Sequence, residues 1–320
     1  MEKSKRLPSE IFVKEKMEFE QAKEKYQKVI RQLKPLADLD KLPTPPVNRA
    51  AYSDRMAWIM AHMAKLAYIP FEESDLGLEQ LKYSLQSGWF NLMKTFNKKS
   101  TQAFLAKNDE FAVLAFRGTQ PTKWEDVRTD LRALKQKTIE GKVHKGFKEA
   151  FDDVRDEIVD IVDKSIGQDL PLYITGHSLG AALATVATQE LEEEFNDLIA
   201  ACYTFGSPRV GDGKYEKSIK APFYRIVNTT DIVTLVPFFF GTFVHVGDPR
   251  YLSRRKVENV YRIYRGIPFL RRVFESVIET ILPIFRLKNP FWPWVAAHNM
   301  DLYIEKLESY AKARNSVSGN

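Results

Sequence analysis

A serine stands between two glycines in the segment Gly176-His177-Ser178-Leu179-Gly180. The residues before it, "LYIT", are apolar and β-prone, whereas the residues after it, "AALATVATQELEEEF", favour a helix. Glycines flank a serine in this way where a chain turns sharply from a strand into a helix, because no side chain fits beside the turn. The turn raises the serine hydroxyl above the sheet edge, near the helix N-terminus. The sequence therefore predicts that Ser178 is a nucleophile.

A nucleophilic serine needs a general base and a carboxylate that orients the base. Where the serine occupies a turn of this kind, the acid and then the base follow it in the chain. Asp231 comes at the end of an apolar stretch, "FYRIVNTTD", that is predicted to be a strand. Of the five histidines, only His245 and His298 follow Ser178. The residue types favour Asp231 as the acid and leave the base open between these two histidines.

The elements that must position these side chains alternate between strands and helices. Two strands are expected in "TQAFLAKNDEFAVLAFRGTQ" around a "KND" turn, and a helix is expected from Lys148 to Ile166. The strands "LYIT", "IAACYTFG" and "FYRIVNT" follow, separated by a helix over 181–195 and by a short helix. This alternation predicts an α/β fold with a mostly parallel sheet, whose functional residues lie at the carboxyl ends of the strands.

Six segments together resemble the class 3 lipases, the fungal triacylglycerol-lipase-like branch of the α/β-hydrolases. They occur in the family's order over about residues 51 to 312, less one insertion: "LAFRGT" (114–119), "VHKGF" (143–147), "ITGHSLGAALA" (174–184), "TFGSPRVGD" (204–212), "NTTDIVTLVP" (228–237) and "HNMDLYIEKL" (298–307). The resemblance implies an α/β-hydrolase fold and hydrolysis of carboxyl esters of acylglycerols or phospholipids. No organic cofactor is implied by the residues of the chain.

The resemblance assigns roles to matching positions. Ser178 corresponds to the family's nucleophile, Asp231 to the acid and His298 to the base, whereas His245 corresponds to a histidine that is not catalytic. Thr119 corresponds to the residue that lines the oxyanion hole.

Further positions complete the expected site. The backbone N–H of Leu179 is expected to be the second oxyanion donor. Trp124 and Val127 lie in the short segment that corresponds to the family's lid, on one narrow apolar face. The family usually has proline where this chain has Thr234. No group of His, Cys and Asp residues has the spacing of metal ligands, so no metal is expected.

The chain is expected to have three parts outside the hydrolase core. Residues 1–45 are predicted to form a charged helical extension and linker, in which Phe12, Phe19, Tyr26 and Leu33 recur every seven residues. The hydrolase domain is predicted over 46–312, interrupted by a basic amphipathic insertion over 251–293, and 313–320 is a tail. The insertion holds nine Lys or Arg and three Asp or Glu, a formal charge of +6 that equals the charge of the whole chain.

Two interpretations of the insertion remain open. A basic amphipathic helix can lie on an anionic membrane, and it can also cover an acyl pocket with its apolar face inward. Nucleic acid is a weaker expectation, because the basic residues alternate with apolar ones at helical spacing.

Composition sets the expected location and the alternative functions. The single cysteine, Cys202, permits no internal disulfide, and the N-terminal residues are too charged for a signal peptide. A cytoplasmic location is therefore expected, with peripheral membrane contact. The alternative functions are a lipid acyltransferase and a catalytically inert, membrane-binding regulatory protein on the same fold.

Overall fold

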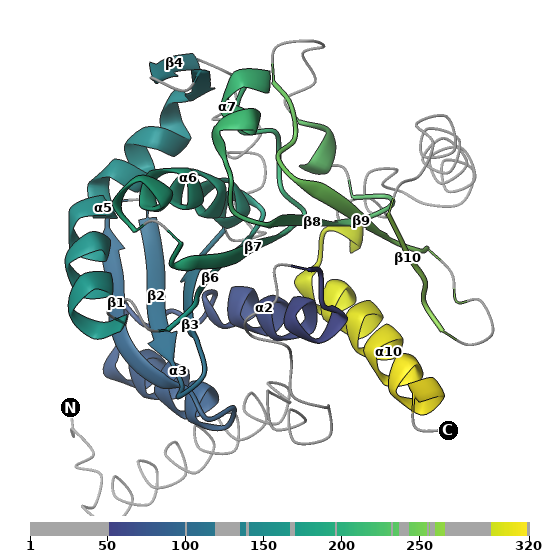
Figure 1. The fold of residues 1–320 in the computed structure, drawn as a ribbon. Helices are drawn as coiled ribbons and strands as arrows, with labels where there is room; N and C mark the ends of the chain where they lie inside the picture. Colours follow the sequence, from purple (N-terminus) through teal and green to yellow (C-terminus); the bar gives the residue numbers. More distant parts are fainter. Residues whose placement is uncertain are drawn as a thin grey trace, which may run out of the picture.

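An eight-stranded sheet forms the centre of the computed structural model of the chain (Figure 1). The structure describes residues 51–99, 101–118, 135–138, 141–166, 170–195, 197–231, 233–236, 243–254, 256, 260–265 and 296–318. The strands lie in the order β1-β2-β3-β6-β7-β8-β9-β10. Their bounds are β1 (Asn91–Lys98), β2 (Thr101–Lys107), β3 (Ala112–Phe116), β6 (Leu172–His177), β7 (Ile199–Phe205), β8 (Phe223–Asn228), β9 (Asp248–Leu252) and β10 (Ile263–Tyr264).

The middle of the sheet is parallel and its two edges are antiparallel. Strands β3, β6, β7, β8 and β9 pair in parallel, whereas β1–β2, β2–β3 and β9–β10 are antiparallel pairs. The register places Phe116 of β3 opposite Gly176 of β6, and His177 opposite Phe205 of β7. The carboxyl ends of three neighbouring strands therefore meet beside Ser178. A second sheet pairs β4 (Lys135–Thr138) with β5 (Gly141–His144).

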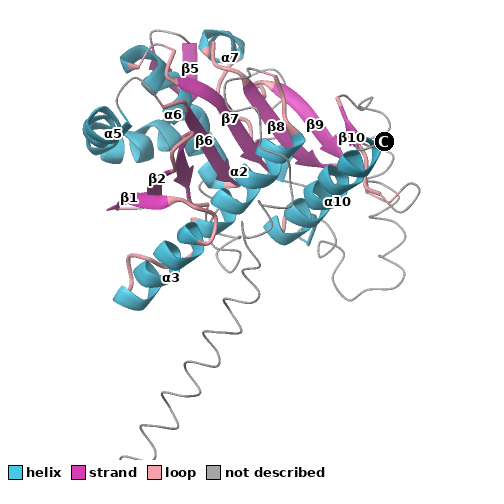
Figure 2. Ribbon diagram, turned by 60° about the horizontal axis from the view of Figure 1, so that its bottom comes forward, coloured by secondary structure: helices cyan, strands magenta, loops and turns pink. Residues whose placement is uncertain are grey.

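Helices cover both faces of the large sheet, which gives three layers (Figure 2). One face packs against α5 and α6, and the other packs against α2, α3 and α10. The helices and the one short 3₁₀ helix of the described residues are α2 (Asp54–Leu66), α3 (Asp75–Gln86), α5 (Lys145–Ile166), α6 (Leu179–Glu194), α7 (Gly213–Ser218), η3 (Val233–Leu235) and α10 (Met300–Ser318).

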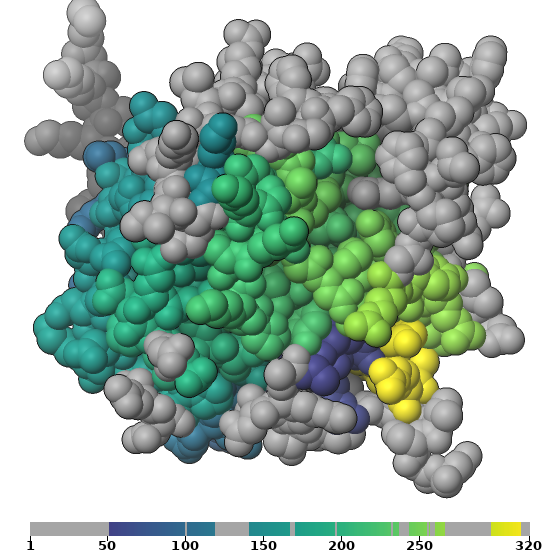
Figure 3. Space-filling view, turned by 45° about the horizontal axis from the view of Figure 1, so that its top comes forward, coloured from purple at the N-terminus to yellow at the C-terminus, as the bar shows by residue number. Residues whose placement is uncertain are grey.

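The two ends of the described chain lie side by side. Helix α10 packs along α2, and Arg314 forms an ion pair of 2.6 Å with the buried Asp54 at the start of α2. In the space-filling view, the purple residues near the start of α2 adjoin the yellow residues of α10 (Figure 3). This contact ties the C-terminal helix, which follows His298, to the face of the sheet that α2 covers.

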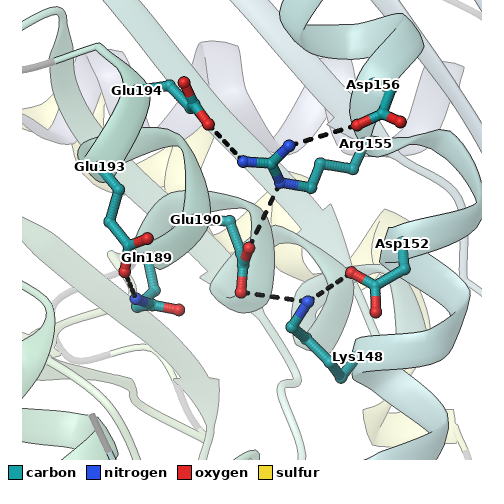
Figure 4. Close-up of polar contacts among 8 residues, drawn as sticks. All are labelled: Lys148, Asp152, Arg155, Asp156, Gln189, Glu190, Glu193 and Glu194. Carbon is teal, nitrogen blue, oxygen red and sulfur yellow. Dashed lines mark hydrogen bonds and ion pairs between the residues drawn. The ribbon is translucent and has the colours of Figure 1, made fainter. Parts of the chain in front are cut away.

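A network of ion pairs joins α5 to α6 on the opposite face (Figure 4). Glu190 of α6 forms ion pairs with Lys148 Nζ at 3.3 Å and with Arg155 Nε at 3.4 Å. Lys148 also pairs with Asp152, and Arg155 pairs with Glu194. The network fixes α5 against the helix that begins next to Ser178.

The predicted α/β fold with a mostly parallel sheet is confirmed. The predicted hairpin around the "KND" turn is β2 and β3, and the expected helix over 148–166 is α5, which begins three residues earlier. Residues 1–45 and most of the insertion lie outside the described residues, so the boundaries expected for these parts stay predictions. Within the insertion, residues 251–252 complete β9 and residues 263–264 form β10. None of the helices in the described part of the chain is both long and apolar enough to cross a membrane.

Candidate active site

Ser178 occupies the turn between β6 and α6, and its backbone is strained. Its φ is 60° and its ψ is −126°, a conformation that non-glycine residues seldom adopt. The Ser178 N–H donates to the carbonyl of Phe205 at 3.0 Å, which holds the turn against the end of β7. Strain of this kind persists only where the surroundings impose it, and it is concentrated at functional sites.

The two glycines beside Ser178 allow α6 to approach the sheet closely. A Cβ atom on Gly176 would overlap with the carbonyl of Gly180, and a Cβ on Gly180 would overlap with the carbonyl of Phe116. The predicted reason for the glycines, that no side chain fits beside the turn, is therefore confirmed. Helix α6 begins at Leu179, which places the Leu179 N–H in its first turn, where N–H groups have no partner within the helix.

Asp231 lies three residues beyond β8 and is buried, with 1% of its surface exposed. Its Oδ2 accepts from the Tyr303 hydroxyl at 2.6 Å and lies 2.8 Å from His298 Nδ1. Its Oδ1 accepts from the N–H of Val233 at 2.9 Å, at the start of η3. Three hydrogen-bond donors therefore hold a buried carboxylate in one orientation.

Thr234 stabilises the loop after Asp231 in a way that the proline usual in the family could not. The Thr234 hydroxyl donates to the carbonyl of Asp231 at 2.8 Å, and proline has no hydroxyl. His245 contacts the same loop, because its Nε2 lies 2.8 Å from the Thr234 carbonyl. The structure thus places His245 against the loop that follows Asp231.

His298 precedes α10 and faces Asp231 with its Nδ1. A carboxylate can only accept, so Nδ1 carries the proton and Nε2 is the nitrogen with the basic lone pair. The His298 ring stacks on His177, with centroids 4.3 Å apart and an interplanar angle of 29°. Asn228 Nδ2 donates to the carbonyl of Ala297 at 2.8 Å, which ties the preceding residue to the end of β8.

The three side chains gather at the end of β7. A Cβ atom on Gly206 would lie 2.7 Å from Asp231 Oδ2 and 2.8 Å from His298 Nδ1. The residue before Gly206, Phe205, accepts the hydrogen bond from the Ser178 N–H. Ser178 and the Asp231–His298 pair therefore flank the same two residues of the chain.

The remaining histidines have other surroundings. His144, 4% exposed, stacks on Phe147 with centroids 4.2 Å apart, and burial lowers its pKa. His62 packs edge-on against Trp58 with centroids 4.4 Å apart. His177 is buried, and its pKa is well below the usual range, first because of desolvation and second because of the neighbouring His298.

Three predicted site residues lie outside the described residues. They are Thr119, expected at the oxyanion hole, and Trp124 and Val127, expected on the lid. Their roles stay predictions. The residue just before Thr119, Gly118, is described and lies against Ser178, because a Cβ on it would come within 3.1 Å of Ser178 Cβ.

Sequence reasoning missed several residues that contact the site. Tyr303 bonds to Asp231 from α10, and Lys306 on the same helix donates to Asn228 Oδ1 at 2.7 Å. Tyr303 and Lys306 are three residues apart and both are buried, so they share the inner face of α10. The signal in the sequence was this polar face on a helix directly after His298.

Metal ligation has no candidate in the part of the chain that the structure describes. No three or more His, Cys, Asp or Glu side chains gather there in a way that could hold an ion.

Comparisons with known proteins identify relatives of this chain. The family model for class 3 lipases matches residues 113–241. A lipase of Rhizomucor miehei is 34% identical over 173 residues, which cover 50% of this chain and 47% of that protein. A chloroplastic phospholipase A(1) of Arabidopsis thaliana is 31% identical over 175 residues, covering 48% and 39%. The predicted resemblance to class 3 lipases is confirmed. The chain spans less than half the length of these curated relatives.

Solved structures show the same fold. The lipase of Rhizopus microsporus var. chinensis superposes with a TM-score of 0.57 at 25% identity, over 70% of this chain and 85% of that one. A triacylglycerol lipase with a serine-protease triad superposes with a TM-score of 0.54 at 24% identity, over 64% and 83%. The α/β-hydrolase fold is therefore established for this chain.

The names of the relatives state different cellular locations. One is chloroplastic, and a mono- and diacylglycerol lipase of Malassezia restricta, 38% identical over 101 residues covering 30% of this chain and 34% of that protein, is secreted. The predicted cytoplasmic location of this chain stays a prediction.

Proposed function

We propose that this chain, whose residues 113–241 match the class 3 lipases, is a serine hydrolase that cleaves carboxyl esters of acylglycerols or phospholipids. The observation that carries the proposal is a hydrogen bond of 2.8 Å between the buried Asp231 and His298 at the end of β7, beside a strained serine. The printed activities of the relatives, lipase and phospholipase A(1), support this class of substrate.

The proposed reaction begins with attack of the Ser178 hydroxyl on the ester carbonyl. His298 Nε2 takes the hydroxyl proton, and Asp231 stabilises the imidazolium that forms. The Leu179 N–H and Thr119 stabilise the oxyanion of the tetrahedral intermediate, and loss of one such donor typically costs about 2.7–4 kcal/mol of transition-state stabilisation. His298 then protonates the oxygen of the leaving alcohol. The ester C–O bond breaks, and the acyl group remains on Ser178. Attack by water, activated by His298, releases the fatty acid.

The ordered acid and base favour a working enzyme over an inert one. Three donors on Asp231 and a stacked, hydrogen-bonded His298 maintain a geometry that a purely structural protein has no need to keep. An acyltransferase would use the same acyl-enzyme and differ only in the acceptor, which would be a second alcohol in place of water.

The proposal includes peripheral contact with anionic membranes through residues 251–293. Among the described residues of this segment, Arg254 and Lys256 are exposed, and the Arg265 side chain is 83% exposed. Each basic residue near an anionic surface contributes about 1 kcal/mol of binding.

The test compares the wild type with Ser178→Ala and with the control Ser218→Ala, whose hydroxyl bonds within α7. Turnover of a short p-nitrophenyl ester should be abolished in Ser178→Ala and unchanged in the control, with both variants folded. A mixed lipid extract, analysed by mass spectrometry before and after incubation, identifies the species consumed. Free fatty acid supports hydrolysis, whereas a new acylated lipid indicates acyl transfer. Wild-type turnover in folded Ser178→Ala would contradict the assignment of the nucleophile.

A further inference from the structure

Tyr68, two residues beyond the end of α2, places its hydroxyl between two segments of the candidate site. The hydroxyl lies 2.8 Å from His177 Nδ1 and accepts a hydrogen bond from the N–H of Gly118. Gly118 ends the segment that follows β3, immediately before Thr119. His177 precedes Ser178. Tyr68 is therefore in contact with both the segment of the expected oxyanion donor and the turn that carries the nucleophile.

The other nitrogen of His177 extends this contact to the proposed base. His177 Nε2 lies 2.8 Å from the carbonyl oxygen of His298. A carbonyl only accepts, so Nε2 carries the proton and Nδ1 is left as an acceptor. The Tyr68 hydroxyl must then donate to Nδ1, which leaves its oxygen to accept from Gly118. The three hydrogen bonds are therefore mutually consistent. The Gly118 N–H donates to Tyr68, the Tyr68 hydroxyl donates to His177 Nδ1, and His177 Nε2 donates to the His298 carbonyl.

Close packing supports the same arrangement. A Cβ atom on Gly118 would overlap with the Tyr68 hydroxyl and with the carbonyl of His177. Glycine at this position lets the backbone approach both groups. A side chain at position 118 would therefore collide with the groups that surround the hydrogen bond from the Gly118 N–H to Tyr68.

The stacking of His177 on His298 requires that His177 be neutral. When His298 takes the serine proton it becomes an imidazolium, 4.3 Å from the His177 ring. A second positive charge at that distance would oppose this step, whereas a neutral aromatic face attracts a cation. Burial lowers the pKa of His177, so the ring stays neutral near pH 7.

We propose that Tyr68 and His177 are positioning residues, whose hydrogen bonds hold the segment before Thr119, the nucleophile turn and the backbone of His298 in fixed relative positions. The inference rests on the proposed function in so far as it concerns turnover. Neither side chain is placed at a reacting atom. Their effect is to fix the distance between the oxyanion donors and the base.

The kinetic test removes one hydroxyl. Tyr68→Phe keeps the ring but loses the donor to His177 and the acceptor for Gly118. We expect kcat on a soluble ester to fall by roughly 10- to 100-fold with KM little changed, because misplacement of about 1 Å has an effect of this size. The matched control is Tyr203→Phe, at a buried tyrosine whose hydroxyl accepts from the Ser53 N–H at 3.3 Å, away from the site. Its kcat should equal that of the wild type. Equal kcat values in the two variants would overturn the proposal.

A spectroscopic measurement separates this inference from the proposed function. ¹⁵N NMR of the histidine rings should show His177 protonated at Nε2 and hydrogen-bonded at Nδ1, and the Nδ1 signal should shift in Tyr68→Phe but not in Tyr203→Phe. If the wild type has no esterase activity, the proposed function fails, and these shifts still decide whether the hydrogen bonds exist. A His177 ring protonated at Nδ1, or unaffected by Tyr68→Phe, would overturn the inference even in an active enzyme.

Discussion

His298 and His245 have different partners, and this difference supports one of them as the base. His298 Nδ1 lies 2.8 Å from the Asp231 carboxylate, whereas His245 Nε2 lies 2.8 Å from the Thr234 carbonyl. A base needs a carboxylate to stabilise its imidazolium, and a single carbonyl does so less well. The residue types alone left the two histidines as alternatives. The structure adds the contact that favours His298.

We therefore predict that His298→Ala loses roughly 10⁴-fold or more in turnover, on the scale of triad deletions. His245→Ala should lose activity only in proportion to the stability lost when the loop after Asp231 loses its contact. Kinetics on a soluble ester, with thermal unfolding measured in parallel, checks both variants. The opposite ranking in well-folded proteins would show that the base is His245.

His144 is a buried histidine with no hydrogen-bond partner on either ring nitrogen among the residues that the structure describes. Burial lowers its pKa below the ordinary value of 6.5. Below pH 6.5 the unfolded chain therefore binds a proton at this residue that the folded protein does not. The unfolded state gains stability as the pH falls, so the free energy of unfolding decreases from pH 6.5 down to the pKa of the folded state.

We predict that His144→Phe reduces this pH dependence. The slope of the unfolding free energy against pH, between pH 6.5 and the pKa of folded His144, should fall by up to about 1.4 kcal/mol per unit, the value for one proton. Part of the slope should remain, because the pKa of His177 is lowered too. Denaturant unfolding at several pH values provides the measurement. An unchanged slope would mean that His144 is already protonated in the folded protein or has the same pKa when unfolded.

Among the elements, the buried central strands were predicted from the sequence, whereas β1, β9 and β10, at the two sides of the sheet, were missed. Strand β6 is an apolar run that is buried along its whole length, so it was recognised. Strand β1, "NLMKTFNK", lies at the sheet edge and only one of its eight residues is buried, so its side chains show no clear alternation. Strand β9, "DPRYL", contains a proline, which ordinarily argues against a strand. Its parallel pairing with β8 is a long-range contact that local pattern does not contain.

The contact between α5 and α6 depends on Glu190, which serves two cations (Figure 4). The side chains of Glu190 and Lys148 are only 13% and 16% exposed, so water screens their pairing less than at an open surface. We predict that Glu190→Gln lowers the free energy of unfolding by about 1 kcal/mol at low salt and by less at high salt. Turnover of a soluble ester should not change.

The matched control is Asp160→Asn, which removes an ion pair with Lys164 on the same helix. These side chains are 57% and 66% exposed, so an effect of at most a few tenths of a kcal/mol is expected. Urea unfolding at two salt concentrations compares the two variants. Equal, small effects would show that the network between the helices contributes no more than a surface pair.

For the whole molecule, the site was predictable where chain order carries the information. Ser178 and Asp231 each follow a predicted strand, and the resemblance to class 3 lipases supplied His298. The hydroxyls of Tyr303 and Tyr68 were not predictable, because the first contacts Asp231 across 72 residues of sequence and the second contacts His177 across 109. Only the packing of α10 along α2 and of both helices on the sheet brings these groups to the site.

The net formal charge of the chain, +6, equals that of residues 251–293, so removing basic residues from this segment should weaken the proposed membrane contact and leave turnover of soluble esters intact. The variant replaces Arg254, Arg255, Arg271 and Arg272 with glutamine. Binding to anionic vesicles and hydrolysis of vesicle lipid should both fall, since each basic residue contributes about 1 kcal/mol near an anionic surface. Turnover of a soluble ester should stay near the wild-type value.

Co-sedimentation with anionic and neutral vesicles at low and high salt measures this binding. The wild type should bind anionic vesicles at low salt and detach at high salt. A wild type that ignores anionic vesicles would contradict membrane docking and favour the segment as a cover of the acyl pocket. Phe274→Ser would then reduce stability and soluble-ester turnover together.

Covalent labelling can establish whether Ser178 is the nucleophile of an acyl-enzyme. A fluorophosphonate reacts with a serine whose hydroxyl is activated by a base and whose oxyanion site is formed. We expect one adduct per chain, located at Ser178 by peptide mass spectrometry, with loss of ester turnover in step with labelling. The adduct should be absent from Ser178→Ala and from heat-denatured protein. A folded wild-type protein that stays unlabelled, or that is labelled and inactivated at another residue, would show that Ser178 is not the nucleophile.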